Sequence, residues 1–451
     1  MQTSTFVRAS VTALALYLLA PASASADAIL PKLVYRPKAG SQLIPCDRAS
    51  QRLILTHSAH LDPACTYTGG VEIVRSDVVF DCRGALIDDP ERNDAGGIVI
   101  RGPATAKITN VSVRNCRVRG FLNNFRVTRD GFRALQPGRE YDDGFDRIEL
   151  RNSRLLESRG IGAFIDAYVS GVRLRDLEVA HSGGVGIYLE AGSRDTRVLR
   201  NYIHDNGYGD VDPVNGAPLE VAGMEFRYLS TGREGLAIDG SRDNYVARNV
   251  FERNSNGAIF LYKNCGEYVT ERPQQWFPRR YGADRNRIRR NTIIDEPNGI
   301  WVGSRMSQNQ LFQNCSDAFY LANSLQTVHE DFAKHNIIQS NTFRNVAFAI
   351  RIEDDDTRVE RNSIHSENRD HLALLVGTGY RASVLGRPVT GSVIQGNYAD
   401  VPGNIAPFVW IHSLGDTVFR RNRAGLRGAL FPPIVPPATN FHLFMKELWV
   451  P

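Results

Sequence analysis

The sequence is poor in lysine, and it lacks both a block of basic residues and a long apolar run beyond its N-terminal region. Only six of the 54 basic residues are lysine, a bias we attribute to genome composition. The arginines are spread among 49 acids, and the net charge is only +5. This distribution argues against a nucleic-acid partner. No later stretch is long and apolar enough to span a membrane.

The overall composition is that of a folded globular protein. The chain of 451 residues is 42% hydrophobic and 23% charged, which excludes wholesale disorder and a multi-span membrane protein. Its 39 glycines favour a turn-rich β architecture over a helical bundle. Length alone allows either two or three domains or one large all-β domain.

The N-terminus has the pattern of a secretory signal peptide. Arg8 precedes an apolar run from Val11 to Ala20, and small residues follow up to Ala26. The run is about half of the ~20 residues that a membrane span needs, so we expect residues 1–26 to be cleaved and the protein to be periplasmic or secreted. Export permits disulfides among the six cysteines. We favour Cys46 with Cys65, and no Cys-x-x-Cys spacing indicates a metal site.

A two-part unit repeats along the chain. The first part is a glycine followed by a short strand of alternating apolar residues, as in Gly186 to Glu190. The second is a polar turn containing asparagine with another short strand, as in Arg200 to Ile203. Other copies of the first part lie at 162–166, 235–239, 257–262, 299–303 and 318–322, and other copies of the second lie at 151–153, 248–251, 290–293, 340–343, 361–364 and 421–423.

The repeat length predicts a solenoid. Equivalent positions are 24 residues apart between Asp166 and Glu190 and 21 apart between Asn341 and Asn362. Strands this short at this spacing cannot pair locally, so each must stack on its equivalent one coil away and form parallel sheets. Asparagine at the turn tolerates a left-handed backbone, and its side chain can bond the neighbouring coil. The pattern resembles the right-handed parallel β-helix of pectate-lyase-like proteins over roughly residues 70–425.

The predicted organisation is all-β with long insertions. We expect a cap segment at 27–70, the β-helix at 71–425 and a C-terminal cap or tail at 426–451. Where the spacing exceeds one period, we expect insertions at 121–146, 205–234 and 266–284. Long loops on a rigid body often form the walls of a binding groove, and we predict that all three leave the helix on the same side.

One outward face carries the candidate site. With Ile165, Leu189, Ile238 and Leu261 in one inward column, the residues that follow them, Asp166, Glu190, Asp239 and Tyr262, lie on the outside. A companion column, two residues earlier on each strand, reads Phe164, Tyr188, Ala237, Phe260, Trp301 and Tyr320. Stacked acids repel one another unless a cation or a substrate intervenes, and aromatic faces can stack on sugar rings. A solvent-exposed ladder of acids paired with arginines is the structural alternative.

Two chemistries fit this face. Carboxylates about 5 Å apart on adjacent coils match a retaining glycosidase pair, and a separation of about 10 Å is closer to an inverting pair. Alternatively the acids, with Ca²⁺ bound at Asp166, Glu190 and Asp239, would neutralise a uronate while a base removes the C5 proton in a lyase or epimerase. Lys263 is the preferred base if the chain bends there, and His181 and the pair His204-Asp205 are rivals.

The resemblance stops short of one enzyme family. The Asp-Pro-His-Asp motif of mannuronan epimerases and the Asn-Thr-Asp and Gly-His-Gly motifs of pectin hydrolases are absent, so fold alone cannot settle function. We predict an exported, monomeric protein acting on an anionic polysaccharide, with lyase or epimerase chemistry ahead of hydrolysis and a non-catalytic carbohydrate-binding or envelope role as the further alternative. Candidate catalytic residues are Lys263, Asp239, Glu190 and Asp166, and candidate substrate-binding residues are Tyr188, Tyr262, Phe260, Arg227, Arg279 and Arg280.

Overall fold

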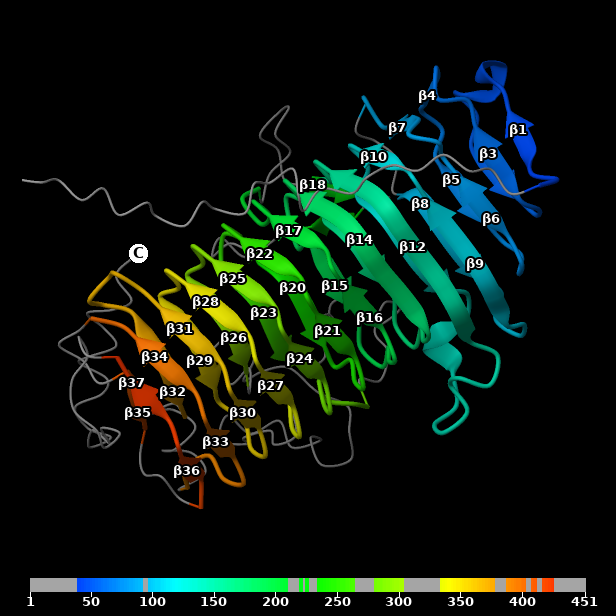
Figure 1. Ribbon diagram of the computed structural model, residues 1–451. Helices are drawn as coiled ribbons and strands as arrows, with labels where there is room; N and C mark the ends of the chain where they lie inside the picture. The colour runs from blue at the N-terminus through cyan, green and yellow to red at the C-terminus, as the bar shows by residue number, and fades with distance from the viewer. Residues whose placement is uncertain are drawn as a thin grey trace, which may run out of the picture.

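The chain forms an elongated stack of β-coils (Figure 1). The computed structural model describes residues 39–91, 96–209, 233–263, 280–303, 333–377, 387–402, 407–411 and 416–425, and the backbone of 219–221 and 224–226. Over these residues the helices are two 3₁₀ turns, η1 (Cys46–Arg48) and η2 (Phe132–Ala134). Neither they nor any other helix in these ranges could cross a membrane.

One face of the stack is a parallel sheet with twelve described strands. Consecutive strands of this sheet come from consecutive coils, as the period predicts. In sheet order they are β2 (Leu53–Leu55), β5 (Val71–Ile73), β8 (Gly96–Gly102), β11 (Asn123–Arg129), β13 (Ile161–Ile165), β15 (Ile187–Leu189), β20 (Glu234–Asp239), β23 (Gly257–Tyr262), β26 (Asn298–Val302), β29 (Phe348–Ile352), β32 (Leu372–Val376) and β35 (Phe408–Trp410).

The other described strands of the coils form two parallel flanks. The long strands β12 (Phe145–Leu156) and β14 (Val172–Ala180) run through both flanks and join them into one sheet. The first flank also contains β1 (Gln42–Ile44), β3 (Ala59–Leu61), β6 (Val79–Asp81), β9 (Ile108–Arg114), β16 (Arg197–Leu199), β21 (Tyr245–Ala247), β24 (Arg287–Arg289), β27 (Ile337–Gln339), β30 (Arg358–Glu360), β33 (Val393–Gln395) and β36 (Val418–Arg420). The second contains β4 (Thr66–Tyr67), β7 (Leu86–Asp88), β10 (Arg117–Arg119), β17 (Tyr202–His204), β22 (Val250–Glu252), β25 (Thr292–Ile294), β28 (Thr342–Arg344), β31 (Ser363–His365), β34 (Tyr398–Asp400) and β37 (Arg423–Ala424). A separate antiparallel pair, β18 (Leu219–Val221) and β19 (Met224–Phe226), stands outside both sheets.

The predicted inward column is confirmed. Ile165 pairs with Leu189, Leu189 with Ile238, and Ile238 with Leu261 across four neighbouring strands. All four side chains are fully buried. Burial of each contributes about 1.5–3 kcal/mol relative to exposure, so the alternating pattern accounts for both the register and the core.

The asparagine turns form the predicted ladder, with one correction. From Asn201 onward, the backbone N–H of each rung donates to Oδ1 of the next rung at 2.9–3.0 Å. The left-handed residue is not this asparagine but the one before it, such as Arg200 at φ 54°. In an earlier coil the left-handed residue is Asn152 itself, and Ser153 makes the ladder bond. The later rungs are Asn249, Asn291, Asn341, Asn362, Asn397 and Asn422.

The repeated glycines are explained by close contact between coils. A Cβ added to Gly162 would lie 2.5 Å from the carbonyl oxygen of Gly186. A Cβ on Gly186 would lie 2.6 Å from the carbonyl oxygen of Gly235. Both distances are too short for any side chain, so glycine is required wherever adjacent coils approach in this way.

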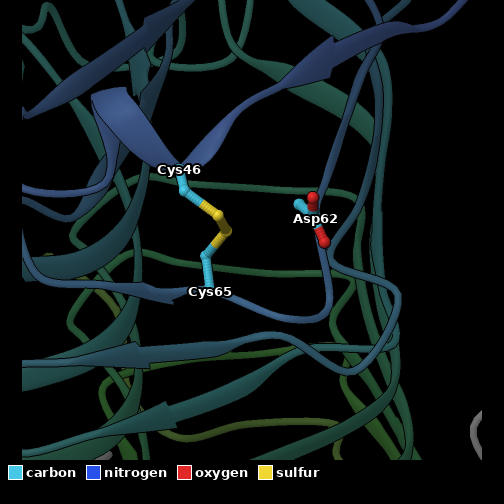
Figure 2. Close-up of side chains that lie close together, drawn as sticks. All are labelled: Cys46, Asp62 and Cys65. Atoms are coloured by element: carbon cyan, nitrogen blue, oxygen red, sulfur yellow. A yellow bond between two sulfur atoms is a disulfide. The ribbon is translucent and has the colours of Figure 1, made fainter.

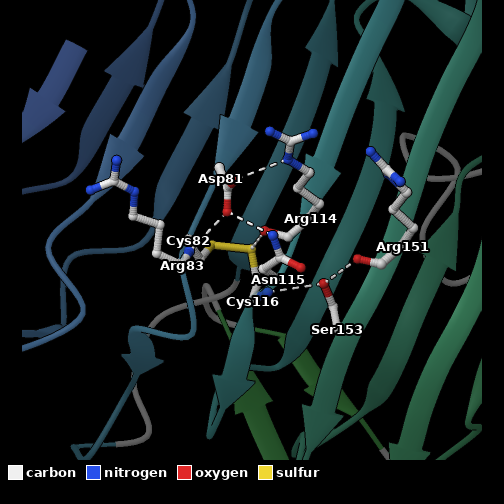
Figure 3. The surroundings of a disulfide bond; sticks show 8 residues. All are labelled: Asp81, Cys82, Arg83, Arg114, Asn115, Cys116, Arg151 and Ser153. Atoms are coloured by element: carbon white, nitrogen blue, oxygen red, sulfur yellow. Dashed lines mark hydrogen bonds and ion pairs between the residues drawn. A yellow bond between two sulfur atoms is a disulfide. The ribbon is translucent and has the colours of Figure 1, made fainter. Parts of the chain in front are cut away.

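Two disulfides tie the first coils together. Cys46 is bonded to Cys65, as predicted, beside the Asp62 carboxylate (Figure 2). Cys82 is bonded to Cys116, a pairing that the sequence left open. Around it, the side chain of Asp81 accepts hydrogen bonds from Arg114, Asn115 and the backbone of Arg83, and Ser153 accepts one from the Cys116 amide (Figure 3).

The stack differs from the prediction at two places. Residues 42–67, assigned to a cap segment, already contribute strands to both sheets, so stacking begins earlier than predicted. The expected strand at 318–322 lies outside the described residues, and β26 pairs directly with β29. Consequently Arg351, not Tyr320, follows Trp301 in the outward column.

Candidate functional site

The outer face of the twelve-stranded sheet carries the predicted columns. Phe164, Tyr188, Ala237 and Phe260 are in register on β13, β15, β20 and β23, and Trp301 follows on β26. Two positions further along the chain come Asp166 and Glu190, directly after β13 and β15, and Asp239 and Tyr262, the last residues of β20 and β23. The predicted side chains therefore lie on adjacent strands of one face.

Asp166 is held in a fixed ion pair. Its Oδ2 accepts hydrogen bonds from Arg126 Nη2 at 2.5 Å and from Thr128 Oγ1 at 2.6 Å, and it is only 3% exposed. Arg126 lies on β11, one strand away, within the segment that the sequence assigned to an insertion. This carboxylate corresponds to the structural alternative, an acid paired with arginine, because its charge is already neutralised.

Asp239 is bonded to a tyrosine of the neighbouring strand. The Tyr188 hydroxyl, from β15, donates to Asp239 Oδ2 at 2.5 Å, and Asp239 is fully buried. Glu190 stands on the strand between Asp166 and Asp239, and its Oε1 accepts the backbone N–H of Ala191. Glu190 and Asp239 are thus on adjacent coils, as predicted.

Glu234 was missed by the sequence reasoning. Strict alternation places it inward with Leu236 and Ile238, but the Tyr262 hydroxyl donates to Glu234 Oε1 at 2.6 Å. On the neighbouring strand β23, the consecutive residues Ala258 and Ile259 both pack inward, so alternation also fails near the start of that strand. The position of Glu234 directly after the 205–234 insertion was the available signal. Strand β20 therefore begins and ends with a carboxylate, and each accepts a bond from a tyrosine on a different neighbouring strand.

The aromatic column forms a packed cluster and not an open platform. Phe260 and Tyr262 are buried with Ala237, and Tyr188 and Trp301 pack against them. The Phe260 and Trp301 rings meet edge to face with centroids 5.1 Å apart. The expectation that Phe260 and Tyr262 offer ring faces to a sugar is not met in this structure, whereas Tyr188 and Trp301 are half-buried and retain some exposure.

Lys263 follows directly after β23 and is 1% exposed. A lysine is almost never buried without polar partners, and its burial here sets it apart from an ordinary surface lysine. It is next to Tyr262 in sequence and one strand away from Asp239, whose partner in the register is Tyr262. Lys263 therefore directly follows a residue of one tyrosine-carboxylate pair in the chain.

Arg280 has a structural partner. Its Nη1 donates to Glu140 Oε1 at 3.0 Å, the Tyr281 hydroxyl donates to the same oxygen at 3.3 Å, and Glu140 is 1% exposed. The pair ties the end of the third predicted insertion to the first one. The other two predicted arginines, Arg227 and Arg279, lie outside the residues whose side chains the structure describes.

One tyrosine of the first insertion and one of the third are each packed against an arginine. The Arg194 guanidinium stacks on the Tyr141 ring at 3.5 Å, and that of Arg242 stacks on the Tyr281 ring at 3.7 Å. Burial raises the pKa of Tyr141 to about 12, so its hydroxyl stays protonated at any physiological pH.

The three predicted insertions do not leave the helix on the same side, and that prediction is wrong. The first runs over 130–144 after β11, and the third begins after Lys263 at the end of β23, so both start from the carboxyl ends of strands in the twelve-stranded sheet. The second, between Gly209 and Arg233, returns to the amino end of β20. The described chain therefore meets these insertions at two opposite edges of this face.

The Ca²⁺ expectation does not fit this geometry. Asp166, Glu190 and Asp239 do not bring three ligand oxygens within 4.8 Å of one another, although other groups of described residues do meet that distance. Arg126 and Thr128 also occupy the Asp166 oxygen that would face an ion. Ca²⁺ needs six to eight oxygen ligands, so we derive no step through it.

Comparison with known proteins shows a likeness of fold. A family model described as the right-handed β-helix region matches residues 68–272, which together with the parallel sheets confirms the predicted right-handed parallel β-helix. Similar solved structures include the A-module of the Azotobacter vinelandii mannuronan C-5 epimerase AlgE6, at 12% identity and TM-score 0.46 over 82% of this chain and 87% of that one.

Two further solved structures are similar in the same limited sense. The catalytic domain of a GH87 α-1,3-glucanase in complex with nigerose has 11% identity and TM-score 0.48, over 85% of this chain and 63% of that one. An alginate lyase from Paenibacillus sp. str. FPU-7 has 8% identity and TM-score 0.37, over 72% of this chain and 95% of that one. No curated protein matches the sequence.

Proposed function

We propose that the protein is an exported enzyme that acts on a uronate-containing polysaccharide by removing the proton at C5, as a lyase or an epimerase. One observation carries the proposal. The two carboxylates of β20, Asp239 and Glu234, are each hydrogen-bonded to a tyrosine from a neighbouring strand, and a buried lysine directly follows one of these tyrosines in the chain. Phenol, carboxylate and amine groups are the usual proton donors and acceptors of such chemistry.

Lys263 is the proposed base. Arginine cannot accept a proton at ordinary pH, whereas a lysine amine removed from water can be neutral and do so. Tyr188 already donates to a carboxylate and retains some exposure, so its phenol can pass a proton to the sugar oxygen that leaves in an elimination. In an epimerase the same acid returns a proton to C5 from the opposite face of the ring.

Hydrolysis is the second candidate. The observation that favours it is the placement of Glu190 and Asp239 on adjacent strands, which are about 4.8 Å apart in a sheet. That spacing is close to the ~5 Å separation of a retaining pair. In this alternative one carboxyl protonates the glycosidic oxygen and the other attacks the sugar, and Lys263 serves only to position the substrate.

A panel of anionic and neutral glycans tests both chemistries on the full chain. Absorbance of unsaturated uronates reports elimination, exchange of the C5 hydrogen in heavy water reports epimerisation, and new reducing ends report hydrolysis. Binding without any of these products would favour the non-catalytic alternative, and a failure to bind any glycan would refute the proposal.

Variants then separate the two reactions. If C5 proton removal is correct, Lys263→Ala abolishes turnover while Asp239→Asn mainly raises KM. If hydrolysis is correct, the order is reversed. Lys107→Ala, an exposed lysine on a distant coil, is the matched control and should leave the rate unchanged. Full activity in both Lys263→Ala and Asp239→Asn would show that the site lies elsewhere.

A further inference from the structure

A second group of titratable side chains lies on the other sheet, where β14, β17 and β22 pair side by side (Figure 1). His181 follows β14, His204 ends β17, and Asp205 comes next. One ring nitrogen of His181, one of His204 and one carboxylate oxygen of Asp205 lie within 4.8 Å of one another. This cluster is separate from the candidate site, because that site lies on the twelve-stranded sheet.

The His204 ring is flanked by two carboxylates. Its Nδ1 lies 2.7 Å from Asp205 Oδ2, and its Nε2 lies 3.5 Å from Glu178 Oε1. The residue is 8% exposed, and Nε2 is buried without a hydrogen-bond partner. A neutral imidazole has only one N–H. A neutral ring therefore leaves one of the two carboxylates without a donor, whereas an imidazolium, or a ring that binds a cation at Nδ1 and keeps its proton on Nε2, satisfies both.

We propose that His181, His204 and Asp205 bind a divalent transition-metal ion, of which Zn²⁺ fits best. A metal ion at Nδ1 takes the place of the proton between His204 and Asp205, and the ring proton then sits on Nε2, where it can donate to Glu178. Both carboxylates are thereby satisfied. In open sites Zn²⁺ binds three protein ligands, such as two histidines and a carboxylate, and completes its shell with water.

The surroundings suit such a site. The Tyr202 ring stacks on His204 at a centroid distance of 3.9 Å and fixes the plane of the imidazole. His181 is exposed, so an ion can enter from solvent. Glu178, on the far nitrogen of His204, occupies the place of the carboxylate that typically orients a metal-bound histidine. Two imidazole ligands also select against Ca²⁺, which takes oxygen ligands.

Arg253 should weaken the binding of a metal ion at this site. Its Nε and Nη2 donate to the two oxygens of Asp205 at 2.9 and 3.0 Å. A carboxylate has about four acceptor positions, so Asp205 Oδ2 can bind a metal while it keeps this partner. The positive charge nearby lowers the affinity, and Arg253→Ala should therefore tighten metal binding.

Calorimetric titration of the full chain tests the site, after treatment with a chelator and with Zn²⁺ itself as the probe. We expect a Zn²⁺ equivalent per chain that excess Ca²⁺ does not displace and that His181→Ala and His204→Ala both remove. Glu178→Gln should weaken binding about 10–100-fold, as loss of an orienting partner does. With Co²⁺ in place of Zn²⁺, the visible spectrum should show nitrogen ligation in the wild type.

His365→Ala is the matched control. His365 is in the same column of the second flank, its ring lies beside Tyr398, and its loss should leave the Zn²⁺ equivalent intact. Because His181 is on the surface, His181→Ala remains a fair test even if His204→Ala fails to fold. The proposal is overturned if the wild type binds no Zn²⁺, if His181→Ala binds it as tightly as the wild type, or if Ca²⁺ displaces it.

Discussion

Replacing Asn249 with alanine should destabilise the protein by about 2–4 kcal/mol, which makes this rung a sharp test of the ladder. The Asn249 side chain is 1% exposed. Its Oδ1 accepts the Asn201 N–H at 2.9 Å, and its Nδ2 donates to the Val198 carbonyl at 2.9 Å. The variant leaves the Asn201 N–H buried without a partner, at a cost of about 1–3 kcal/mol, and removes one bond to the Val198 carbonyl, at a cost of about 0.5–1.5 kcal/mol. The Asn291 side chain is less affected by the substitution, because its Oδ1 still accepts the backbone N–H of residue 249.

Asn422→Ala is the matched control. Asn422 makes the same two kinds of bond, to the Asn397 N–H at 3.0 Å and the Ile394 carbonyl at 2.9 Å, but it is only half-buried. Water can replace the lost side chain there, so the expected cost is below about 2 kcal/mol.

Denaturant unfolding and hydrogen exchange measure the two effects. The urea midpoint gives the loss in the free energy of unfolding, and exchange of the Asn201 amide reports the broken bond directly. Protection of that amide should fall in Asn249→Ala and stay unchanged in Asn422→Ala. Equal midpoints for the two variants, or an Asn201 amide that stays protected in Asn249→Ala, would refute the reasoning.

Three further predictions concern stability. Burial raises the pKa of Glu296 well above 4.5, so the folded protein keeps a proton that the unfolded chain releases near that pH. Stability should therefore fall as the pH rises above about 4.5, and Glu296→Gln, which does not titrate and keeps one of the two oxygens that accept from Asn254, should flatten that slope in urea midpoints measured across pH. Cys82→Ser with Cys116→Ser opens a loop of 34 residues and should lower the free energy of unfolding by about 4 kcal/mol in the same assay, and an unchanged midpoint would contradict this. Gly186→Ala forces a Cβ to within 2.6 Å of a neighbouring carbonyl oxygen and should cost about 1–3 kcal/mol in thermal unfolding, whereas a neutral effect would mean that the coils can separate there.

The sequence predicted those parts of the fold that repeat. The inward residues Ile165, Leu189 and Ile238 recur with an alternation that only one register satisfies, and the structure pairs them as expected. The disulfide between Cys46 and Cys65 followed from their closeness at one end of the chain. These features are local or periodic, so a single sequence contains enough information to find them.

The contacts of the site could not be predicted in the same way. Arg126 neutralises Asp166 from a strand that the spacing assigned to an insertion, because an irregular coil hides its own register. Glu234 turns toward Tyr262 where alternation fails, and periodicity says nothing about such a bend. Which edge an insertion leaves from depends on the order of strands within the coil. The spacing between repeats gives the length of an extra segment but not that order.

Because successive coils offer the same hydrogen-bonding groups in the asparagine ladder, one coil can take the place of another. Asn341 and Asn362 begin consecutive turns, and each binds the next rung through the same atoms. Deleting residues 341–361 would set Asn362 against Asn291 with the same donors and acceptors in place. The removed coil contains β29 and with it Arg351 of the outward column, whereas β20 and its two carboxylates are unchanged. Such a protein can gain or lose length by single coils while the coil of β20 stays intact. Under the proposed function, the length of the glycan-binding face and the chemistry done on it can then evolve separately.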